Sequence, residues 1–304
     1  SLLVFLGFYA LVNHNFYRVK DENYAFAHYY LGNAHHREGD YKQALAEFER
    51  ALAIDPAYPS AHLDLGATHF ALGNLDKAEE EFRMELNLNP AQGNACNYIG
   101  LVKQREGRYD EAARWFEKAL QMKTIFPEAH LNLAMAYDRM GREEEALREL
   151  REAVKLEPGL AAAHNLLGVL HLKHGSLAPA IASLEAAVRC EADNPIYHYN
   201  LGLAYAGTRR LDLASSHFER ALELDPLFTD AHANLGNAYL GMGRLDEAMV
   251  SLKEALAINP RLAETHFNLG LAYMRKGLPD SARIEFNRAI ELEPLLQRNL
   301  ERFE

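Results

Sequence analysis

The chain has 304 residues, a formal net charge of −11 and a pI near 5.7. This acidic balance argues against a nucleic-acid-binding protein, because binding to phosphates requires a net basic surface that releases counterions. Its two cysteines, Cys96 and Cys190, are too few for a disulfide framework, so we expect both to be free thiols that pack as small apolar side chains.

Residues 1–24 precede the regular part of the sequence and begin with a nearly apolar run, SLLVFLGFYALV, over residues 1–12. A transmembrane helix needs about 20 apolar residues, so this run is too short to span a bilayer alone. Three interpretations stand: the run is the end of a longer membrane anchor, a helix that caps the first repeat, or a trimmed secretory signal. An anchor would make the protein membrane-associated, and the order of anchor before domain favours the periplasmic or other extracytoplasmic side.

Residues 25–296 repeat one 34-residue unit eight times without insertion. Position 7 of the unit is Leu or Ile, position 8 is Gly or Ala, position 20 is always Ala, position 24 is Phe or Leu, and position 32 is Pro in six units. The units cover residues 25–58, 59–92, 93–126, 127–160, 161–194, 195–228, 229–262 and 263–296.

The spacing within the unit predicts two helices that face each other. Positions 4, 8 and 11 form one stripe on a first helix, and positions 20, 24 and 27 form one on a second helix. Small residues at positions 8 and 20 let the two backbones approach, and large ones at positions 7 and 24 fill the remaining space. A glycine between the helices suits a left-handed helix end, except in the sixth unit, where Arg209 predicts the least ideal turn.

This pattern resembles the tetratricopeptide repeat, as in His232-x2-Leu235-Gly236-x2-Tyr239 followed by Ala248, Leu252 and Pro260. The best-known family pattern has Trp at position 4, where this chain has seven histidines and Cys96; that variant resembles many bacterial repeat proteins and the repeat region of O-linked N-acetylglucosamine transferase. The resemblance implies an all-α, right-handed superhelical α-solenoid of eight helix-turn-helix repeats with terminal capping segments. Residues 297–304 would form the C-terminal cap.

Positions 2, 6, 9 and 13 project away from the helix-pair joint and line the concave surface in the family. Asparagine recurs at position 6, although it is a poor residue for a helix interior. In the transferase family a ladder of such asparagines holds peptide backbone, which makes Asn132, Asn200, Asn234 and Asn268 candidate peptide-binding residues. The alternative is that these amides form hydrogen bonds along their own helices or hold water.

Other side chains on the same surface complete the candidate peptide-binding site. Leu101 and Met135 at position 9 would form a groove floor bordered by Tyr98 and Tyr199, unless they only make contacts between successive first helices. A basic row at position 13 would attract a carboxylate-bearing segment, unless it serves the helix dipole alone. That row includes Arg105, Arg139 and Lys173.

Some family members clamp two carboxylates with Lys and Asn at set positions on successive units. Asn237 and Asn268 fit two of these positions, but Ala233 and Glu264 stand where that pattern has Lys. We therefore do not expect binding of the acidic chaperone tails that such clamps recognise.

We expect no metal site at the histidines, because position 4 of successive units is separated by the distance between packed helices, about 8 to 10 Å. His28 with His35 and His62 with His69 are expected to be core residues with one hydrogen bond each. No zinc-protease motif and no phosphate-binding Gly loop occurs, so we expect no catalytic residue, metal or cofactor.

Two classes of function follow. The first is a non-catalytic scaffold, tethered to a membrane through residues 1–12, that binds an extended peptide or a partner helix and assembles a protein complex. The second is the recognition region of a larger enzyme such as a glycosyltransferase. Self-association through the exposed ends is a weaker option, because the ends of a solenoid are unfinished surfaces.

Overall fold

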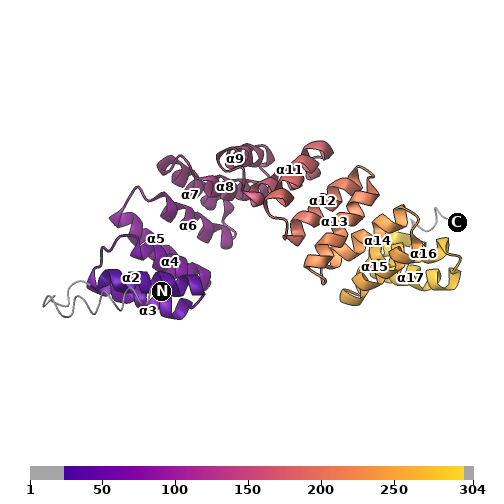
Figure 1. Ribbon diagram of the computed structural model, residues 1–304, viewed down its shortest axis with the longest axis horizontal. Coiled ribbons are helices and arrows are strands. Elements are labelled where there is room, and N and C mark those ends of the chain that lie inside the picture. The colour runs from indigo at the N-terminus through magenta and orange to yellow at the C-terminus, as the bar shows by residue number, and fades with distance from the viewer. Residues whose placement is uncertain (1–23, 298–304) are drawn as a thin grey trace. The chain divides into compact units, whose positions relative to one another are not determined.

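The computed structural model describes residues 24–297, and these residues form consecutive helix pairs with no strand (Figure 1). The chain is an α-solenoid, as the repeat pattern predicts. The apolar run of residues 1–12 and nearly all of the C-terminal cap predicted at 297–304 lie outside the described residues.

Each predicted unit contains one helix pair. The first helices are α2 (Ala25–Glu38), α4 (Ala61–Ala71), α6 (Gly93–Arg105), α8 (Pro127–Arg139), α10 (Ala161–Lys173), α12 (Pro195–Gly207), α14 (Thr229–Gly241) and α16 (Ala263–Arg275). The second helices are α3 (Tyr41–Ile54), α5 (Leu75–Leu88), α7 (Tyr109–Met122), α9 (Glu143–Leu156), α11 (Leu177–Cys190), α13 (Leu211–Leu224), α15 (Leu245–Ile258) and α17 (Pro279–Leu292). A short 3-10 turn, η2 (Pro294–Leu296), follows α17.

The turns within the pairs have the predicted left-handed residue. Seven glycines between first and second helices have φ of +69° to +79°. In the sixth unit Arg209 adopts φ of +60°, a conformation that costs a residue with a Cβ about 1 to 2 kcal/mol. The pattern therefore locates both the regular turns and the exceptional one.

The joint within a pair is a close contact between position 8 and position 24. A Cβ added at Gly202 would lie 2.6 Å from Cε1 of Phe218, and one at Gly236 would lie 2.6 Å from Cγ of Leu252. In the fourth unit Ala134 stands at position 8 and faces Leu150, and both are fully buried. The small residue at position 8 is thus required by the ring or branched side chain that packs over it.

Histidine at position 4 belongs to the same joint. His28 makes the one contact that we expected, between its Nδ1 and Oε2 of Glu47 at 2.6 Å, whereas His62 makes two. His62 Nδ1 lies 2.6 Å from Oε2 of Glu81, and its Nε2 lies 3.3 Å from the carbonyl oxygen of Pro56. His69, expected to have one hydrogen bond, has a buried Nδ1 without a partner in the described part of the chain. The expectation of one bond is therefore wrong for His62, because position 4 faces the second helix and the preceding loop together. His69 stands at position 11, and its Nδ1 lacks the bond that we expected.

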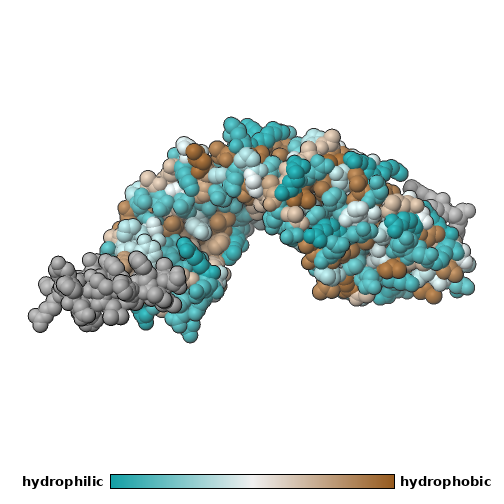
Figure 2. All heavy atoms as spheres, viewed as in Figure 1, coloured by the Kyte–Doolittle hydropathy of each residue, from teal (hydrophilic) through white to brown (hydrophobic). Residues whose placement is uncertain are grey.

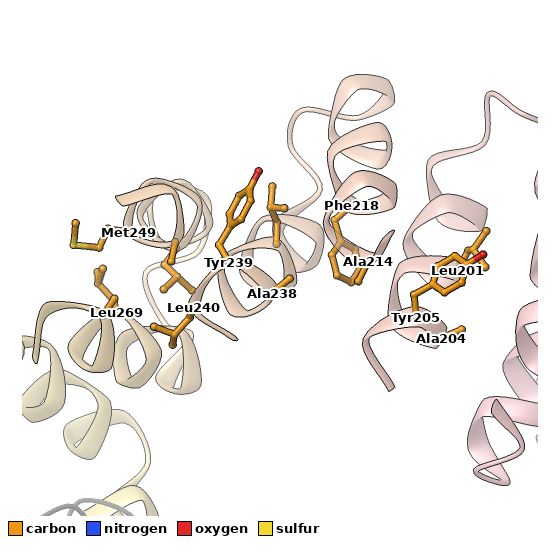
Figure 3. Packing of buried hydrophobic residues seen from close by; sticks show 14 of the residues in the cluster. Leu201, Ala204, Tyr205, Ala214, Phe218, Ala238, Tyr239, Leu240, Met249 and Leu269 are labelled. Atoms are coloured by element: carbon orange, nitrogen blue, oxygen red, sulfur yellow. The ribbon is translucent and has the colours of Figure 1, made fainter. Parts of the chain in front are cut away.

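The chain divides into two compact units, residues 1–156 and 157–304. In the first unit Phe48, Phe82 and Phe116 are fully buried, one in each of three successive second helices. In the second unit one core cluster extends over several repeats, and Figure 3 shows Leu240 of α14, Met249 of α15 and Leu269 of α16 gathered where these helices meet. Neighbouring repeats therefore share their core.

Polar contacts also join neighbouring repeats within each unit. Tyr137 Oη donates to Oε1 of Glu117 at 2.7 Å, and Tyr205 Oη donates to Oε1 of Glu185 at 2.7 Å, each tyrosine reaching the second helix of the preceding repeat. Burial, followed by the hydrogen bond to Glu117, raises the pKa of Tyr137 to about 12. Contacts that recur at one register position thus fix the stacking of the pairs.

The two thiols are free but differ in surroundings. Cys96 is buried, as predicted, beside Ala119 and Phe126, and burial raises the pKa of its thiol. Cys190 is exposed at the end of α11, so the expectation that it packs as a core residue is wrong.

Among the described helices, none combines the length and the apolar character that crossing a membrane requires.

Candidate functional site

The candidate site is the surface formed by positions 2, 6, 9 and 13 of the first helices, here called the first-helix face. Its predicted residues fall in both compact units, and each unit presents its own part. The first unit carries Tyr98, Leu101, Arg105, Asn132, Met135 and Arg139, and the second carries Lys173, Tyr199, Asn200, Asn234 and Asn268.

All four asparagines at position 6 are partly buried and donate a hydrogen bond to the preceding first helix. Asn132 Nδ2 donates to Oδ1 of Asn97 at 3.1 Å, and Asn200 Nδ2 donates to Oδ1 of Asn165 at 2.8 Å. Asn234 Nδ2 donates to Oη of Tyr199 at 3.2 Å, and Asn268 Nδ2 donates to Oδ1 of Asn237 at 2.7 Å. Only Asn234 also bonds along its own helix, to the carbonyl oxygen of Asp230 at 2.9 Å. The amides therefore link consecutive repeats, an arrangement that neither interpretation of the sequence includes.

The same link occurs with other polar groups at positions 5 and 6. Tyr29 Oη donates to Oδ2 of Asp64 at 2.7 Å, across the first two repeats. Burial, followed by this hydrogen bond, raises the pKa of Tyr29 to about 12, and burial raises that of Asp64 as well. Position 5 of one repeat and position 6 of the next thus form a recurring contact pair.

The linking bonds leave one kind of group available on the first-helix face. Each of the four asparagines uses Nδ2, and none of their Oδ1 atoms has a hydrogen-bond partner among residues 24–297. A fixed amide with an open carbonyl oxygen can accept a hydrogen bond from the backbone N–H of another chain. The face therefore presents acceptors whose orientation is already set.

The two predicted aromatic residues pack inward. Tyr98 stacks on Phe82 with ring centroids 4.9 Å apart, and Tyr199 lies 4.7 Å from Phe228. Burial raises the pKa of both phenols. Leu101 is partly buried and Met135 is exposed, so only part of the predicted apolar floor is open to solvent.

The basic row at position 13 is exposed and partly engaged. Arg105 Nη1 donates to the carbonyl oxygen of Phe70 at 2.9 Å, while its guanidinium lies 3.9 Å from the centre of the Phe70 ring. Since Phe70 is near the C-terminal end of α4, this contact matches the attraction of a cation to a helix end, with the neighbouring helix as the acceptor. Arg139 and Lys173 are exposed as well.

A hollow of about 670 Å³ opens on the first-helix face of the last two repeats. Asn234 and Asn268 line it, together with Ala233, Asn237 and Glu264, which were not predicted as site residues. The sequence does contain a signal for it, because Ala233 is the smallest residue at position 5 in the eight repeats. Across residues 24–297, no group of three or more His, Cys, Asp or Glu side chains is placed to hold a metal ion.

Family models of the tetratricopeptide repeat match most of the repeat region. The matches cover residues 32–73, 63–130, 104–166, 195–228, 217–249, 242–277 and 263–296. No curated protein sequence is significantly similar to the chain.

Solved structures share the fold. The chain is 22% identical to a chain of the APC/C hetero-tetramer Cut9-Hcn1, with a TM-score of 0.60 over 84% of this chain and 50% of that one. It is 24% identical to YrrB, a repeat protein with an unusual peptide-binding site, with a TM-score of 0.57 over 62% and 99% of the two chains. It is 27% identical to MamA, with a TM-score of 0.51 over 55% and 97%. The chain thus spans half the length of the Cut9-Hcn1 chain that it matches.

Proposed function

The chain belongs to the tetratricopeptide repeat superfamily, and on that premise we propose that it is a non-catalytic scaffold that binds an extended segment of a partner protein on its first-helix face. The open carbonyl oxygens of the four linked asparagines carry this proposal. They stand at position 6 of the fourth, sixth, seventh and eighth repeats, so in the last three repeats one acceptor recurs per repeat, as the backbone groups of an extended segment recur along its length. A bound segment would meet acceptors held in place beforehand, which lowers the entropic cost of binding.

The surface composition and a structural relative fit binding of a protein segment. Hydrophobic and hydrophilic side chains are interspersed over the surface seen in Figure 2, and reversible protein interfaces have the same average composition as the rest of a protein surface. YrrB, which has the same fold, contains a peptide-binding site. The proposal also includes a membrane tether through residues 1–12, on the extracytoplasmic side, that would hold the scaffold at a membrane surface.

The experiment is selection of random dodecapeptides on the full chain by messenger-RNA display, followed by affinity measurement with the enriched peptides. Two matched pairs of charge substitutions locate the binding face. Met135→Glu changes a first-helix methionine that is 38% exposed, and Met84→Glu changes a second-helix methionine that is 44% exposed. Ile196→Glu and Val250→Glu form the second pair, at residues that are 53% and 61% exposed.

We expect each enriched peptide to lose at least tenfold in affinity for at least one of the two first-helix variants, Met135→Glu and Ile196→Glu. The new carboxylate would be buried against the side chains of the bound peptide. Met84→Glu and Val250→Glu should change the affinity by less than twofold. Enrichment of no peptide, or equal losses from the second-helix variants, would contradict the proposal.

A further inference from the structure

The hollow on the last two repeats exists because two side chains are smaller there than in the preceding repeat. In the sixth repeat Tyr199 at position 5 packs against Phe228 at position 34, with ring centroids 4.7 Å apart. The same positions of the seventh repeat are Ala233 and Leu262, and both line the hollow. The space that two rings fill in one repeat is therefore open in the next.

The missing tyrosine also changes the hydrogen bonds of the amides. Asn234 donates to the hydroxyl of Tyr199, but Asn268 meets Ala233 at the corresponding place and donates instead to Oδ1 of Asn237 at 2.7 Å. Position 9, where Asn237 stands, is mostly apolar in the other repeats. As a result, three amides line one hollow, and their oxygens can accept hydrogen bonds from a ligand.

The charge of the lining determines which side chain the hollow suits. Three acidic residues, Asp230, Glu264 and Glu293, line it, together with one basic residue, Arg261. Within the described residues none of these three acidic side chains has an ion pair or a side-chain hydrogen bond. A lysine or arginine entering the hollow would find unpaired negative charge and amide acceptors, and would bring donors alone.

Resting on the proposed function, we propose that this hollow is a specificity pocket for a lysine or arginine side chain of the extended segment. Ala233 makes the room, Asn234, Asn237 and Asn268 accept hydrogen bonds, and Asp230 and Glu264 supply the opposite charge. The net charge of −11 would favour the approach of a basic segment over the whole protein.

The test uses Ala233→Tyr in the full chain. This substitution copies Tyr199 of the sixth repeat, so it should fill the hollow and give Asn268 a hydroxyl partner while leaving the melting temperature within a few degrees of the parent's. Dodecapeptides selected on the parent chain are selected again on Ala233→Tyr. We expect the peptides lost in the second selection to share a Lys or Arg at one position.

Synthetic peptides then separate charge from shape. Replacing the shared lysine by norleucine, or an arginine by citrulline, should weaken binding to the parent chain at least tenfold, and so should the double variant Asp230→Asn/Glu264→Gln. Arg261→Gln should instead tighten binding severalfold, because it removes the one positive charge in the lining.

The outcomes distinguish this inference from the proposed function. If peptides bind the first-helix face but none is lost on Ala233→Tyr, or if the norleucine peptide binds as tightly as the lysine peptide, the pocket inference is wrong and the scaffold stands. The pocket inference is equally wrong if the shared residue is apolar or acidic. If no peptide is enriched on the parent chain, both fall.

Discussion

Position 4 shows how one residue type is used differently from repeat to repeat. His28, His62, His130 and His266 each face a glutamate nineteen residues later, with Nδ1 to Oε2 distances of 2.6 to 2.7 Å. In the sixth repeat the nineteenth residue is His217, and its Nδ1 lies 3.0 Å from Nδ1 of His198. The sixth repeat therefore places two imidazoles together where the other four repeats place an imidazole beside a carboxylate.

The proton positions in the sixth repeat follow from the contacts. His198 Nε2 lies 3.0 Å from the carbonyl oxygen of Ala192, so it must donate there, and in the neutral ring Nδ1 accepts from His217. Burial, followed by the charge of His198, lowers the pKa of His217, and the carboxylate of Glu185 opposes this shift. The Tyr205 ring stacks on the imidazole of His217. When both imidazoles are protonated, their two Nδ1–H groups face each other.

We predict that the sixth repeat loses stability as the pH falls through the ordinary titration range of histidine, near 6.5. Because the pKa of His217 is lowered in the folded state, the unfolded chain binds more protons between that lowered pKa and about 6.5, so the free energy of unfolding decreases as the pH falls through this window. His217→Glu should recover about 0.5 to 1.5 kcal/mol at pH 5, the contribution of one hydrogen bond. Urea denaturation at pH 5.0 and 7.5 measures the effect.

The reciprocal substitution is the control. Glu285→His in the eighth repeat recreates the two-histidine joint beside His266 and should add acid sensitivity where the parent has a contact between His266 Nδ1 and a carboxylate oxygen. Identical pH profiles for the parent and both variants would show that the joint histidines do not govern acid stability.

Among individual residues, the sequence predicted the packing roles far better than the partners. Gly202 and Ala214 were predicted as joint residues because periodicity alone places them on the facing stripes. The bond from Asn234 to Tyr199 was not predicted, because it depends on how far consecutive first helices are offset, which no pattern within one helix contains. The hollow at Ala233 was not predicted either, because the repeat pattern does not specify position 5 and the space beside it depends on the side chains of two consecutive repeats.

At the scale of the helix pair, the joint tolerates a Cβ at position 8 only where the opposing residue can shift. The fourth repeat combines Ala134 with Leu150, and no repeat combines Ala at position 8 with Phe at position 24. A leucine can change its rotamer to make room, but a phenylalanine ring that is buried on all sides has no such freedom.

We therefore predict different costs for the same substitution in two repeats. Gly202→Ala, facing Phe218, should destabilise the chain by about 1 to 3 kcal/mol through overpacking. Gly236→Ala, facing Leu252, should change the stability by less than about 1 kcal/mol, because the higher helix propensity of alanine offsets the contact. Chemical denaturation of the two variants measures the difference, and equal costs would show that the residue at position 24 does not set the tolerance.

Over the whole molecule, the regular positions of the repeat determine the fold, and the variable positions carry the candidate binding residues. Within each compact unit the repeats pack on their neighbours through the same few positions, so a periodic sequence was sufficient to predict the helices and their pairing. The candidate binding residues stand at the variable positions, and their surroundings arise from differences such as Ala233 in place of Tyr199. Sequence periodicity alone therefore predicts this fold almost completely and this site only in outline.

The association of the whole molecule with a membrane can also be tested, and the prediction depends on residues 1–12. As the end of an anchor, this apolar run should hold the protein in the membrane fraction, and its deletion should move the protein to the soluble fraction without changing the unfolding of the repeats. As a cap, it should instead stabilise the first repeat, and its deletion should increase hydrogen exchange in α2 and leave fractionation unchanged. Membrane sedimentation and hydrogen exchange on the same two proteins measure both effects.

A shuffled version of residues 1–12 provides the control, because it keeps the hydrophobicity and removes any specific packing. Membrane partition depends on the amount of apolar surface and only weakly on its order, so the shuffled protein should sediment with membranes as the parent does. A cap must match the helix that it covers, so shuffling should then expose α2 as deletion does. Sedimentation of the deleted protein with membranes, or loss of protection in α2 with the shuffled segment, would overturn the tether.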